Sequence, residues 1–305
     1  MRAIKVLGIV LLVVVSTPML LIAAAGLTNG RTGVPTQFQG SAMLANPPSA
    51  WTEASTVKVV TYNVHDLKVV SDHRPERMAA IAEWLVGLDP DIVGFQEAFI
   101  ESDRAILEGG LIKSRLKHFQ YYPSGTVGSG LFVASAYPIR ETWFCRYTAS
   151  NPWYRLDEGD WWAGKGVALA RIETPGGLLD FFNTHAQAGY GNPAYKLVRE
   201  QQMADLAAFV TGSRVDTVPA LLVGDMNCRI GDKDFTIAEQ GAGLVRLMTM
   251  DSHIDHVFGV KDARYAFEVL DTVKIEGEID VEGGKSELSD HPGYMSTIRI
   301  TPVAP

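Results

Sequence analysis

Short apolar runs alternate with polar segments along most of the chain, and their spacing predicts a mixture of strands and helices. Residues 57–64 are rich in β-branched and aromatic side chains, which is typical of a strand. From Pro75, apolar residues recur at helical spacing as far as residue 88, where Asp89-Pro90 ends the pattern. Residues 91–97 form a second strand-like run. These segments predict one strand–helix–strand unit at the start of the folded region.

The rest of the chain continues the same mixture. Three more apolar runs predict strands, at 129–135, 218–223 and 294–300. Residues 165–172 and 178–185 flank a Pro-Gly-Gly turn, which indicates a hairpin, and residues 195–211 carry apolar positions at helical spacing. Because strand–helix–strand units occur beside hairpins, the pattern predicts an α/β layered sandwich with mixed sheets.

The N-terminal segment has a different pattern. Arg2 and Lys5 precede a run that is apolar almost throughout to residue 27, which predicts a signal peptide or an N-terminal membrane anchor over residues 1–27. Ala23-Ala24-Ala25 offers a cleavage site, so both alternatives stay open. Basic residues before the run place the remainder on the outer side of the membrane. We therefore expect an exported protein, anchored facing the periplasm or the extracellular side, or secreted after signal cleavage.

Composition narrows the class of protein. Residues 28–55 are rich in Gly, Pro, Ser, Thr, Asn and Gln and predict a flexible linker, which leaves residues 56–305 as the folded domain. The 305 residues carry a net charge of −8, which argues against sequence-tolerant binding to nucleic acid. The two cysteines, Cys145 and Cys228, cannot form a disulfide framework and are expected to be free thiols.

Polar side chains stand at or near the ends of the predicted strands. In layered α/β folds such ends converge on one edge, where loops build a site. The set comprises Asn63, Glu97, His185, Asp225, Asn227, Asp255, Asp290 and His291. Taken alone, each has a structural explanation, such as a turn cap for Asn63 or a half-buried histidine for His185. Six separate segments with the same placement predict a shared site instead.

The residue types indicate the chemistry of that site. Carboxylate and amide oxygens suit Mg²⁺, Mn²⁺ or Ca²⁺, and no cysteine pair has zinc spacing, so a hard cation is favoured. Asp290-His291, just before the last predicted strand, places a histidine beside a carboxylate, an arrangement suited to a general base. The chain has no Gly-x-Ser-x-Gly elbow and no Gly-x-x-x-x-Gly-Lys-[Ser/Thr] loop, which removes the main support for a serine hydrolase or a P-loop enzyme.

Taken in order, these motifs resemble the endonuclease/exonuclease/phosphatase (DNase-I-like) superfamily over residues 57–300. The segments that carry the resemblance are Thr61-Tyr62-Asn63-Val64, Gln96-Glu97, Thr184-His185, Gly224-Asp225-Met226-Asn227, Ile254-Asp255-His256 and Ser289-Asp290-His291. The resemblance implies a four-layer α/β sandwich with two mixed β-sheets as the fold of a catalytic domain over 56–305. It also implies Mg²⁺-dependent cleavage of a phosphate ester, with Mn²⁺ as the alternative cation.

Three further segments are similar to the neutral sphingomyelinases. They are Gly128-Ser129-Gly130-Leu131, Asp160-Trp161-Trp162-Ala163-Gly164-Lys165 and Thr184-His185-Ala186-Gln187-Ala188. The resemblance implies a phospholipase-C-type phosphodiesterase that converts sphingomyelin to ceramide and phosphocholine, with phospholipid at a membrane surface as its partner. No protein partner is inferred. Two alternatives stay open: the same chemistry on another phospholipid, an inositol phosphate or a nucleic acid, and a catalytically inactive binding module.

The resemblance also implies roles for the polar residues. Glu97, Asn63 and Asp290 would hold the metal, whereas His291 would take a proton from the attacking water. Asp255 would fix the tautomer of His291, as a second group orients the base in a triad.

A second set would act on the phosphate. Asp225 and Asn227 would position the water or the phosphate, and His185 would donate a hydrogen bond to a non-bridging oxygen. Lys165 would contact the phosphate or pair with Asp160. Trp153-Tyr154 stands in a loop-like stretch, where the rings suit a lipid–water interface or a choline cage, with buried packing as the alternative.

Overall fold

The computed structural model describes residues 16, 17, 20, 31–40, 49–155 and 157–303, and these ranges build a layered α/β sandwich. Most of the predicted signal or anchor segment lies outside the described residues. Among those described, no helix is both long enough and apolar enough to cross a bilayer.

Two large sheets form the interior of the molecule. In order across the first sheet, the strands are β1 (Thr36–Gln39), β6 (Ile139–Arg146), β7 (Gly166–Thr174), β8 (Gly177–His185), β9 (Ala220–Asp225), β11 (Asp255–Val260) and β10 (Leu244–Arg246). Across the second sheet they are β12 (Tyr265–Ile275), β15 (Gly293–Pro302), β2 (Ser55–Asp66), β3 (Ile92–Ala98), β5 (Phe132–Ser135) and β4 (His118–Tyr121). A separate hairpin pairs β13 (Glu278–Val281) with β14 (Gly284–Glu287).

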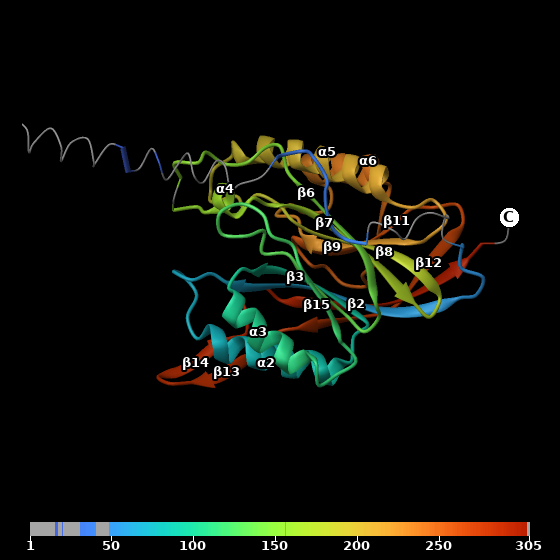
Figure 1. The fold of residues 1–305 in the computed structure, drawn as a ribbon, viewed down its shortest axis with the longest axis horizontal. Helices are drawn as coiled ribbons and strands as arrows, with labels where there is room; N and C mark the ends of the chain where they lie inside the picture. The colour runs from blue at the N-terminus through green and yellow to red at the C-terminus, as the bar shows by residue number, and fades with distance from the viewer. Residues whose placement is uncertain (1–15, 18–19, 21–30, 41–48, 156, 304–305) are drawn as a thin grey trace, which may run out of the picture.

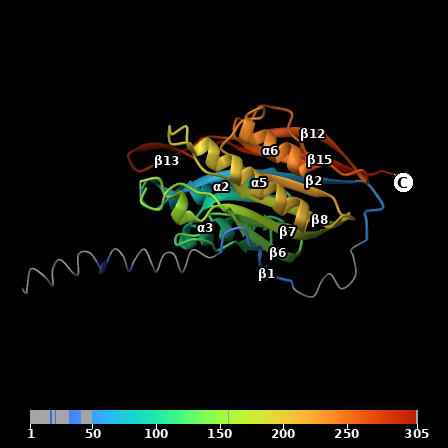
Figure 2. The ribbon, with the colours of Figure 1, turned by 90° about the horizontal axis from the view of Figure 1, so that it is seen from above.

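Helices cover the outer face of each sheet. Helices α5 (Tyr195–Ser213) and α6 (Lys233–Ala242) lie over the first sheet, and α2 (Arg74–Leu88) and α3 (Glu101–Leu111) lie over the second (Figures 1 and 2). The short helix α4 (Asp160–Ala163) lies in the β6–β7 connection. The order helix, sheet, sheet, helix confirms the predicted four-layer fold with two mixed sheets.

The apolar pattern explains this layering. Strands buried on both faces supply the inner core between the sheets, with Val59 of β2, Phe181 of β8 and Val223 of β9 among its members. Two outer cores lie beneath the helix pairs, around Leu206 of α5 and around Leu85 of α2. Continuous apolar runs are typical of strands covered on both faces, which is why these strands could be predicted.

Each sheet contains one parallel pair, and the helices make the connections. Strand β2 runs parallel to β3 across α2, and β8 runs parallel to β9 across α5, whereas the other neighbouring strands in these sheets are antiparallel. Parallel strands need a crossover of this kind, so the predicted strand–helix–strand units hold. The carboxyl ends of all four strands point to one edge of the sandwich.

Parts of the predicted linker, residues 28–55, contact the sandwich where the structure describes them, and the domain boundary itself stays a prediction. Strand β1 pairs antiparallel with β6 at the edge of the first sheet. Trp51 is buried, and its indole Nε1 donates a 2.8 Å hydrogen bond to the Leu178 carbonyl oxygen. Its backbone amide donates to the Tyr265 hydroxyl at 2.9 Å. One short strand and one anchored aromatic residue thus fasten a polar segment that has no apolar periodicity.

Candidate active site

Strand register brings the polar strand ends together. In the first sheet His185 is level with Asp225 on the parallel neighbour, and Asp225 is level with Asp255 on the antiparallel one. In the second sheet Asn63 is level with Gln96, so Glu97 follows directly beside it. The two groups of side chains meet across the gap between the sheets.

Asn63 joins these groups. Its amide Nδ2 donates to Glu97 Oε1 and to Asp225 Oδ2, both at 3.1 Å, and the side chain is fully buried. Its Oδ1 accepts the backbone amide of His65 at 3.1 Å. One asparagine therefore holds a carboxylate from each sheet in a shared polar cluster.

Glu97 has the properties of a cation ligand. Its backbone is in the left-handed region, with φ of 58°, a conformation that costs energy for a non-glycine residue and is often found at functional sites. Its Oε2 is buried and has no hydrogen-bond partner among the described residues. Burial raises the pKa of the Glu97 carboxyl to about 7. A hard cation would satisfy this oxygen and favour the charged form, so the donor set fits such an ion.

His291 and Asp255 form a second part of the site. His291 Nδ1 lies 2.9 Å from Asp255 Oδ2 and 3.8 Å from Asp225 Oδ2. Burial acts to lower the pKa of His291, but the bond to Asp255 and the charges of Asp225 and Asp290 outweigh it and raise the pKa to about 10. At pH 7 a histidine with this pKa is mostly protonated, so it would serve as a base efficiently only if a bound cation offset the neighbouring carboxylates and lowered its pKa.

Asp225, Asp255 and His291 are also a candidate metal group in their own right. One ligand atom from each lies within 4.8 Å of the others. The sequence assigned these three to catalysis and the metal to Glu97, Asn63 and Asp290. This candidate group shares the carboxylate of Asp225 with the cluster that Asn63 and Glu97 form.

His185 and Lys165 lie on the other side of Asp225. His185 Nε2 is 2.9 Å from Lys165 Nζ and 3.4 Å from Asp225 Oδ2. Burial, and then the charge of Lys165, lower the pKa of His185 well below its usual value, so the ring is neutral. Nε2 therefore accepts a hydrogen bond from the ammonium group. The predicted donation from His185 to a phosphate oxygen would require Lys165 to leave this nitrogen.

Lys165 pairs with Asp160, one of the two alternatives that the sequence offered. Nζ lies 2.8 Å from Asp160 Oδ1 and donates to the Ala186 carbonyl at 2.8 Å. Asp160 is fixed in turn by the Gln187 amide at 2.6 Å and the Ala188 backbone amide at 2.9 Å. This ion pair is buried beside the carboxylate cluster and can deliver an ammonium group to it.

Asn227 and Asp290 lie at the margin of the cluster. The Asn227 backbone amide donates to Asp225 Oδ1 at 2.9 Å, and its side chain donates to the Ala186 carbonyl at 3.1 Å. Asp290 is half exposed, 3.7 Å from His65 Nε2, and no contact among the described residues joins it to Glu97. Asn227 thus orients Asp225, whereas the role of Asp290 as a metal ligand stays a prediction.

Sequence reasoning missed two residues that shape the cluster. His65, with φ of 48°, follows Asn63 and faces Asp290. Ser289 donates its hydroxyl to the Asn63 carbonyl at 2.7 Å and ties the loop that carries His291 to β2. Their short distance along the chain from Asn63 and His291 was the available signal.

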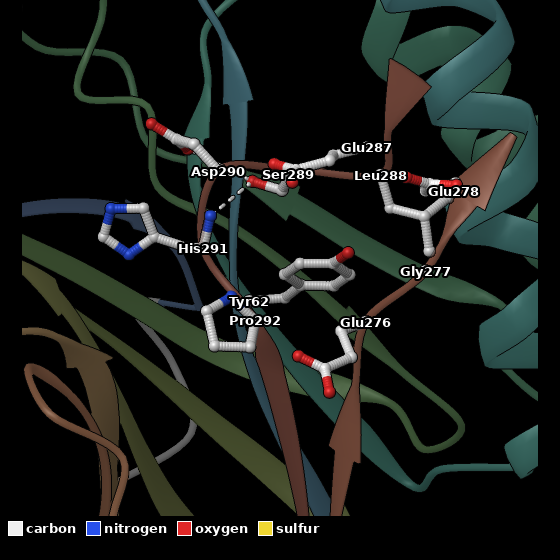
Figure 3. A pocket seen from close by; sticks show the side chains of 10 residues that line it. All are labelled: Tyr62, Glu276, Gly277, Glu278, Glu287, Leu288, Ser289, Asp290, His291 and Pro292. Atoms are coloured by element: carbon white, nitrogen blue, oxygen red, sulfur yellow. Dashed lines mark hydrogen bonds between the residues drawn. The ribbon is translucent and has the colours of Figure 1, made fainter. Parts of the chain in front are cut away.

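Two cavities with different linings adjoin this cluster. A cavity of about 340 Å³ is lined by His291 and Asp290 and, on the far wall, by Glu276, Glu278 and Glu287 (Figure 3). The ring of Tyr62 lies against it, with the hydroxyl directed away from His291 (Figure 3). Lys274 and Lys285 pair with Glu276 and Glu278, which leaves Glu287 and Asp290 as the acidic groups of this cavity that no lysine or arginine pairs with among the described residues. The second cavity, of about 780 Å³, has Glu97, Lys165 and His185 on its wall. Lys68, Asp157, Glu158 and Asp160 line it as well, and apolar side chains supply most of the remaining surface.

Comparison with known proteins places this site in a family. The model of the Endonuclease/Exonuclease/phosphatase family matches residues 60–291, and the chain belongs to this family. A putative neutral sphingomyelinase from Drosophila melanogaster is 28% identical over 82% of this chain and 62% of its own length. An inositol phosphosphingolipids phospholipase C from Schizosaccharomyces pombe is 34% identical over 47% of this chain and 34% of its own. The chain spans less than two thirds of either relative.

Solved structures agree on the fold. The structure of a Staphylococcus aureus beta toxin variant with bound magnesium ions aligns with 79% of this chain and with 99% of its own chain. The TM-score is 0.63 and the sequence identity is 18%. At that identity the likeness shows the DNase-I-like architecture alone. The resemblance to this superfamily and the predicted fold class are therefore confirmed.

Proposed function

We propose that this chain is a Mg²⁺-dependent phosphodiesterase of the phospholipase C type that cleaves sphingomyelin to ceramide and phosphocholine. The observation that carries the proposal is the buried cluster in which Asn63 joins Glu97 to Asp225. The His291–Asp255 pair flanks that cluster on one side and the Lys165–Asp160 pair on the other. Glu97 and Asp225 would hold the cation, which supplies a Lewis acid that takes up charge developing on the phosphate.

The protein side chains divide the proton transfers. Asp255 holds His291 through Nδ1, which leaves Nε2 as the nitrogen that takes a proton from the attacking water. Lys165 carries its ammonium group to the opposite side of the cluster, where it can donate to the leaving alkoxide. Asp225 and Asn227 keep the water and the phosphate in register between them. In-line displacement needs this opposed placement of base and acid.

The acidic cavity supports a cationic head group. A quaternary ammonium group is attracted by carboxylates, and Glu287 and Asp290 line the cavity beside His291. An inositol phosphosphingolipid is the second candidate, because the S. pombe relative carries that name at 34% identity. Its anionic head group would meet the same carboxylates unfavourably, which favours sphingomyelin.

We also propose that the enzyme acts outside the cytoplasm, anchored by residues 1–27 or secreted after their cleavage. The apolar run behind Arg2 and Lys5 supports this. Mass spectrometry of the N-terminus, together with protease protection in the producing cell, tests both alternatives.

The test of the activity is phosphocholine release from sphingomyelin vesicles by the full chain, with Mg²⁺ or with EDTA. We expect release that EDTA abolishes and that His291→Ala lowers by about 10²–10⁴-fold, the usual contribution of general acid–base catalysis. The control is His118→Ala, since His118 lies level with Ser135 at the opposite end of the second sheet. Cleavage of an inositol phosphosphingolipid in preference to sphingomyelin would move the assignment to the second candidate.

A further inference from the structure

The larger cavity has an apolar interior that the catalytic chemistry does not explain. Its walls include Phe99, Ile100, Val127 and Trp162, and Glu97 and Lys165 also line it. A volume of about 780 Å³ falls within the range of small-molecule sites. A phosphate ester bound at the polar cluster would thus have an apolar groove immediately beside its reacting end.

The rim of this cavity exposes aliphatic side chains to solvent. Val69 is 94% exposed, Val70 64% and Val127 53%. Val69 and Val70 are adjacent in the turn that follows β2, and Leu67 and Lys68 of the same turn line the cavity. Clustered exposed apolar residues at the mouth of a cavity mark a surface that meets a lipid or a partner.

The position of the cavity selects its occupant. His291 lines the acidic cavity, whereas His185 and Lys165 line the apolar one, so the base and the leaving-group side face different cavities. In an in-line displacement the leaving group departs opposite the attacking water. In a phospholipase C reaction the leaving group is the lipid alcohol, so its hydrocarbon belongs on the side of Lys165.

We propose that the 780 Å³ cavity binds the hydrocarbon chains of a membrane phospholipid, and that the turn carrying Val69 and Val70 enters the lipid layer while the ester is cleaved. This inference rests on the proposed function, because the side of the leaving group is defined by that reaction. Continuity of the apolar wall with Glu97 and Lys165 is what commits the cavity to the substrate. Lys68, on the same turn, can reach lipid phosphate groups at the surface.

The first experiment varies the chain of the leaving group. Alkyl phosphocholines of increasing length, each below its critical micelle concentration, are hydrolysed by the full chain at one fixed detergent concentration. We expect kcat/KM to rise by up to about fourfold per added methylene, the factor that corresponds to burying one CH₂ group. Val127→Ser should reduce that rise, whereas the control Val303→Ser should not, because Val303 follows β15 and neither lines the cavity. A kcat/KM that does not change with chain length would overturn the assignment of this cavity to hydrocarbon chains.

The second experiment follows the turn itself and needs no turnover. Cys145 and Cys228 are both buried free thiols, so a cysteine placed at 70 can be labelled selectively with an environment-sensitive fluorophore. We expect the emission of V70C to shift to the blue when the full chain binds phosphatidylcholine vesicles in EDTA, whereas V303C stays in water. If the protein is bound to vesicles and the labels at 70 and 303 both keep the emission typical of water, the turn does not insert.

The two proposals fail differently. EDTA-sensitive hydrolysis of p-nitrophenyl phosphocholine reports the proposed chemistry without any alkyl chain. Suppose that this hydrolysis persists while kcat/KM does not change along the alkyl series and the label at 70 reports water. The assignment of the cavity to hydrocarbon chains is then wrong, and the proposed phosphodiesterase activity stands. If no substrate is hydrolysed, the proposed function is wrong, and with it the assignment of the cavity to a leaving group.

Discussion

At the residue scale, the site contains buried polar atoms that lack a hydrogen-bond partner among the described residues. Glu97 Oε2, Asp255 Oδ1 and His185 Nδ1 are all buried without a hydrogen-bond partner among the described residues. Buried polar atoms are nearly always paired, and exceptions concentrate where a ligand completes the set. The three residues belong to the cluster around Asp225, and their unpaired atoms are candidate positions for a cation, a water or a phosphate.

Metal binding should depend on Glu97. Glu97→Gln keeps the shape of the side chain but removes the charge, so we expect Mg²⁺ affinity to fall by at least about tenfold. Because a ligand that binds only the folded state stabilises it, Mg²⁺ should raise the melting temperature of the wild type and not that of the variant. Differential scanning calorimetry with and without about 10 mM Mg²⁺ measures this shift in melting temperature.

The matched control is Glu101→Gln, an exposed glutamate in the first turn of α3. It should retain the full response to Mg²⁺. An unchanged response in the Glu97 variant would move the metal to the group formed by Asp225, Asp255 and His291.

Sequence reasoning reached the residues of the cluster more readily than their contacts. Residues at strand ends could be gathered because strands of one sheet finish at one edge, and this brought Asn63, Glu97 and Asp225 to the same place. The direction of a side chain depends on loop geometry that periodicity does not encode. That is why Asp290 lies toward solvent, and why the choice of Asp160 for Lys165 required the structure.

At the element scale, a buried ion triad fastens the central strands of the first sheet. Arg171 of β7 pairs with Glu141 of β6 and, at 2.6 Å, with Asp180 of β8, and all three side chains are almost fully buried. Its guanidinium also donates to the Ser213 carbonyl at the end of α5. One arginine therefore links three strands and a helix.

Removal of this arginine should be costly. Arg171→Met leaves two buried carboxylates without a counter-ion, and we expect a loss of about 3–5 kcal/mol in the free energy of unfolding. Arg140→Met removes the exposed partner of Glu173 nearby and should cost about 0–1 kcal/mol. Urea denaturation of both variants gives the comparison, and equal midpoints would show that the buried triad adds no stability.

Elements with a strong apolar signal were predicted, and those with a weak signal were not. Helix α5 and strand β9 carry long apolar stripes or runs. Helix α3 buries only Asp103, Leu107 and Leu111, and β12 lies at the edge of its sheet with many exposed positions. Short contact faces leave too few apolar residues for periodicity to register, and pairing across the sheet then decides the structure.

At the scale of the whole molecule, the segment before β2 closes the end of the sandwich opposite the site. Trp51 packs edge-to-face against Tyr265, with ring centroids 6.3 Å apart, and it covers the β7–β8 turn. Gly177 has φ of 126°, and a Cβ there would lie 2.7 Å from the Trp51 ring. The glycine is therefore required both by the turn and by the close approach of the indole.

We predict that Trp51→Ala in the full chain destabilises the fold by about 3–5 kcal/mol, the usual cost of removing a buried tryptophan. Trp84→Ala, on the half-exposed face of α2, should cost much less. Thermal unfolding of the two variants measures the difference. Similar melting temperatures would mean that Trp51 only covers the surface.

Each sheet holds only half of the chemistry. Asn63 and Glu97 belong to the second sheet, whereas His185, Asp225 and Asp255 belong to the first. The bonds from Asn63 to Asp225 and from His291 to Asp255 each join one residue of either half. The proposed catalysis would therefore begin only when the inner core has closed, and a state with only one finished sheet would be inert. The recovery of activity during refolding should therefore report when the two sheets pack against each other. It should lag behind the formation of secondary structure.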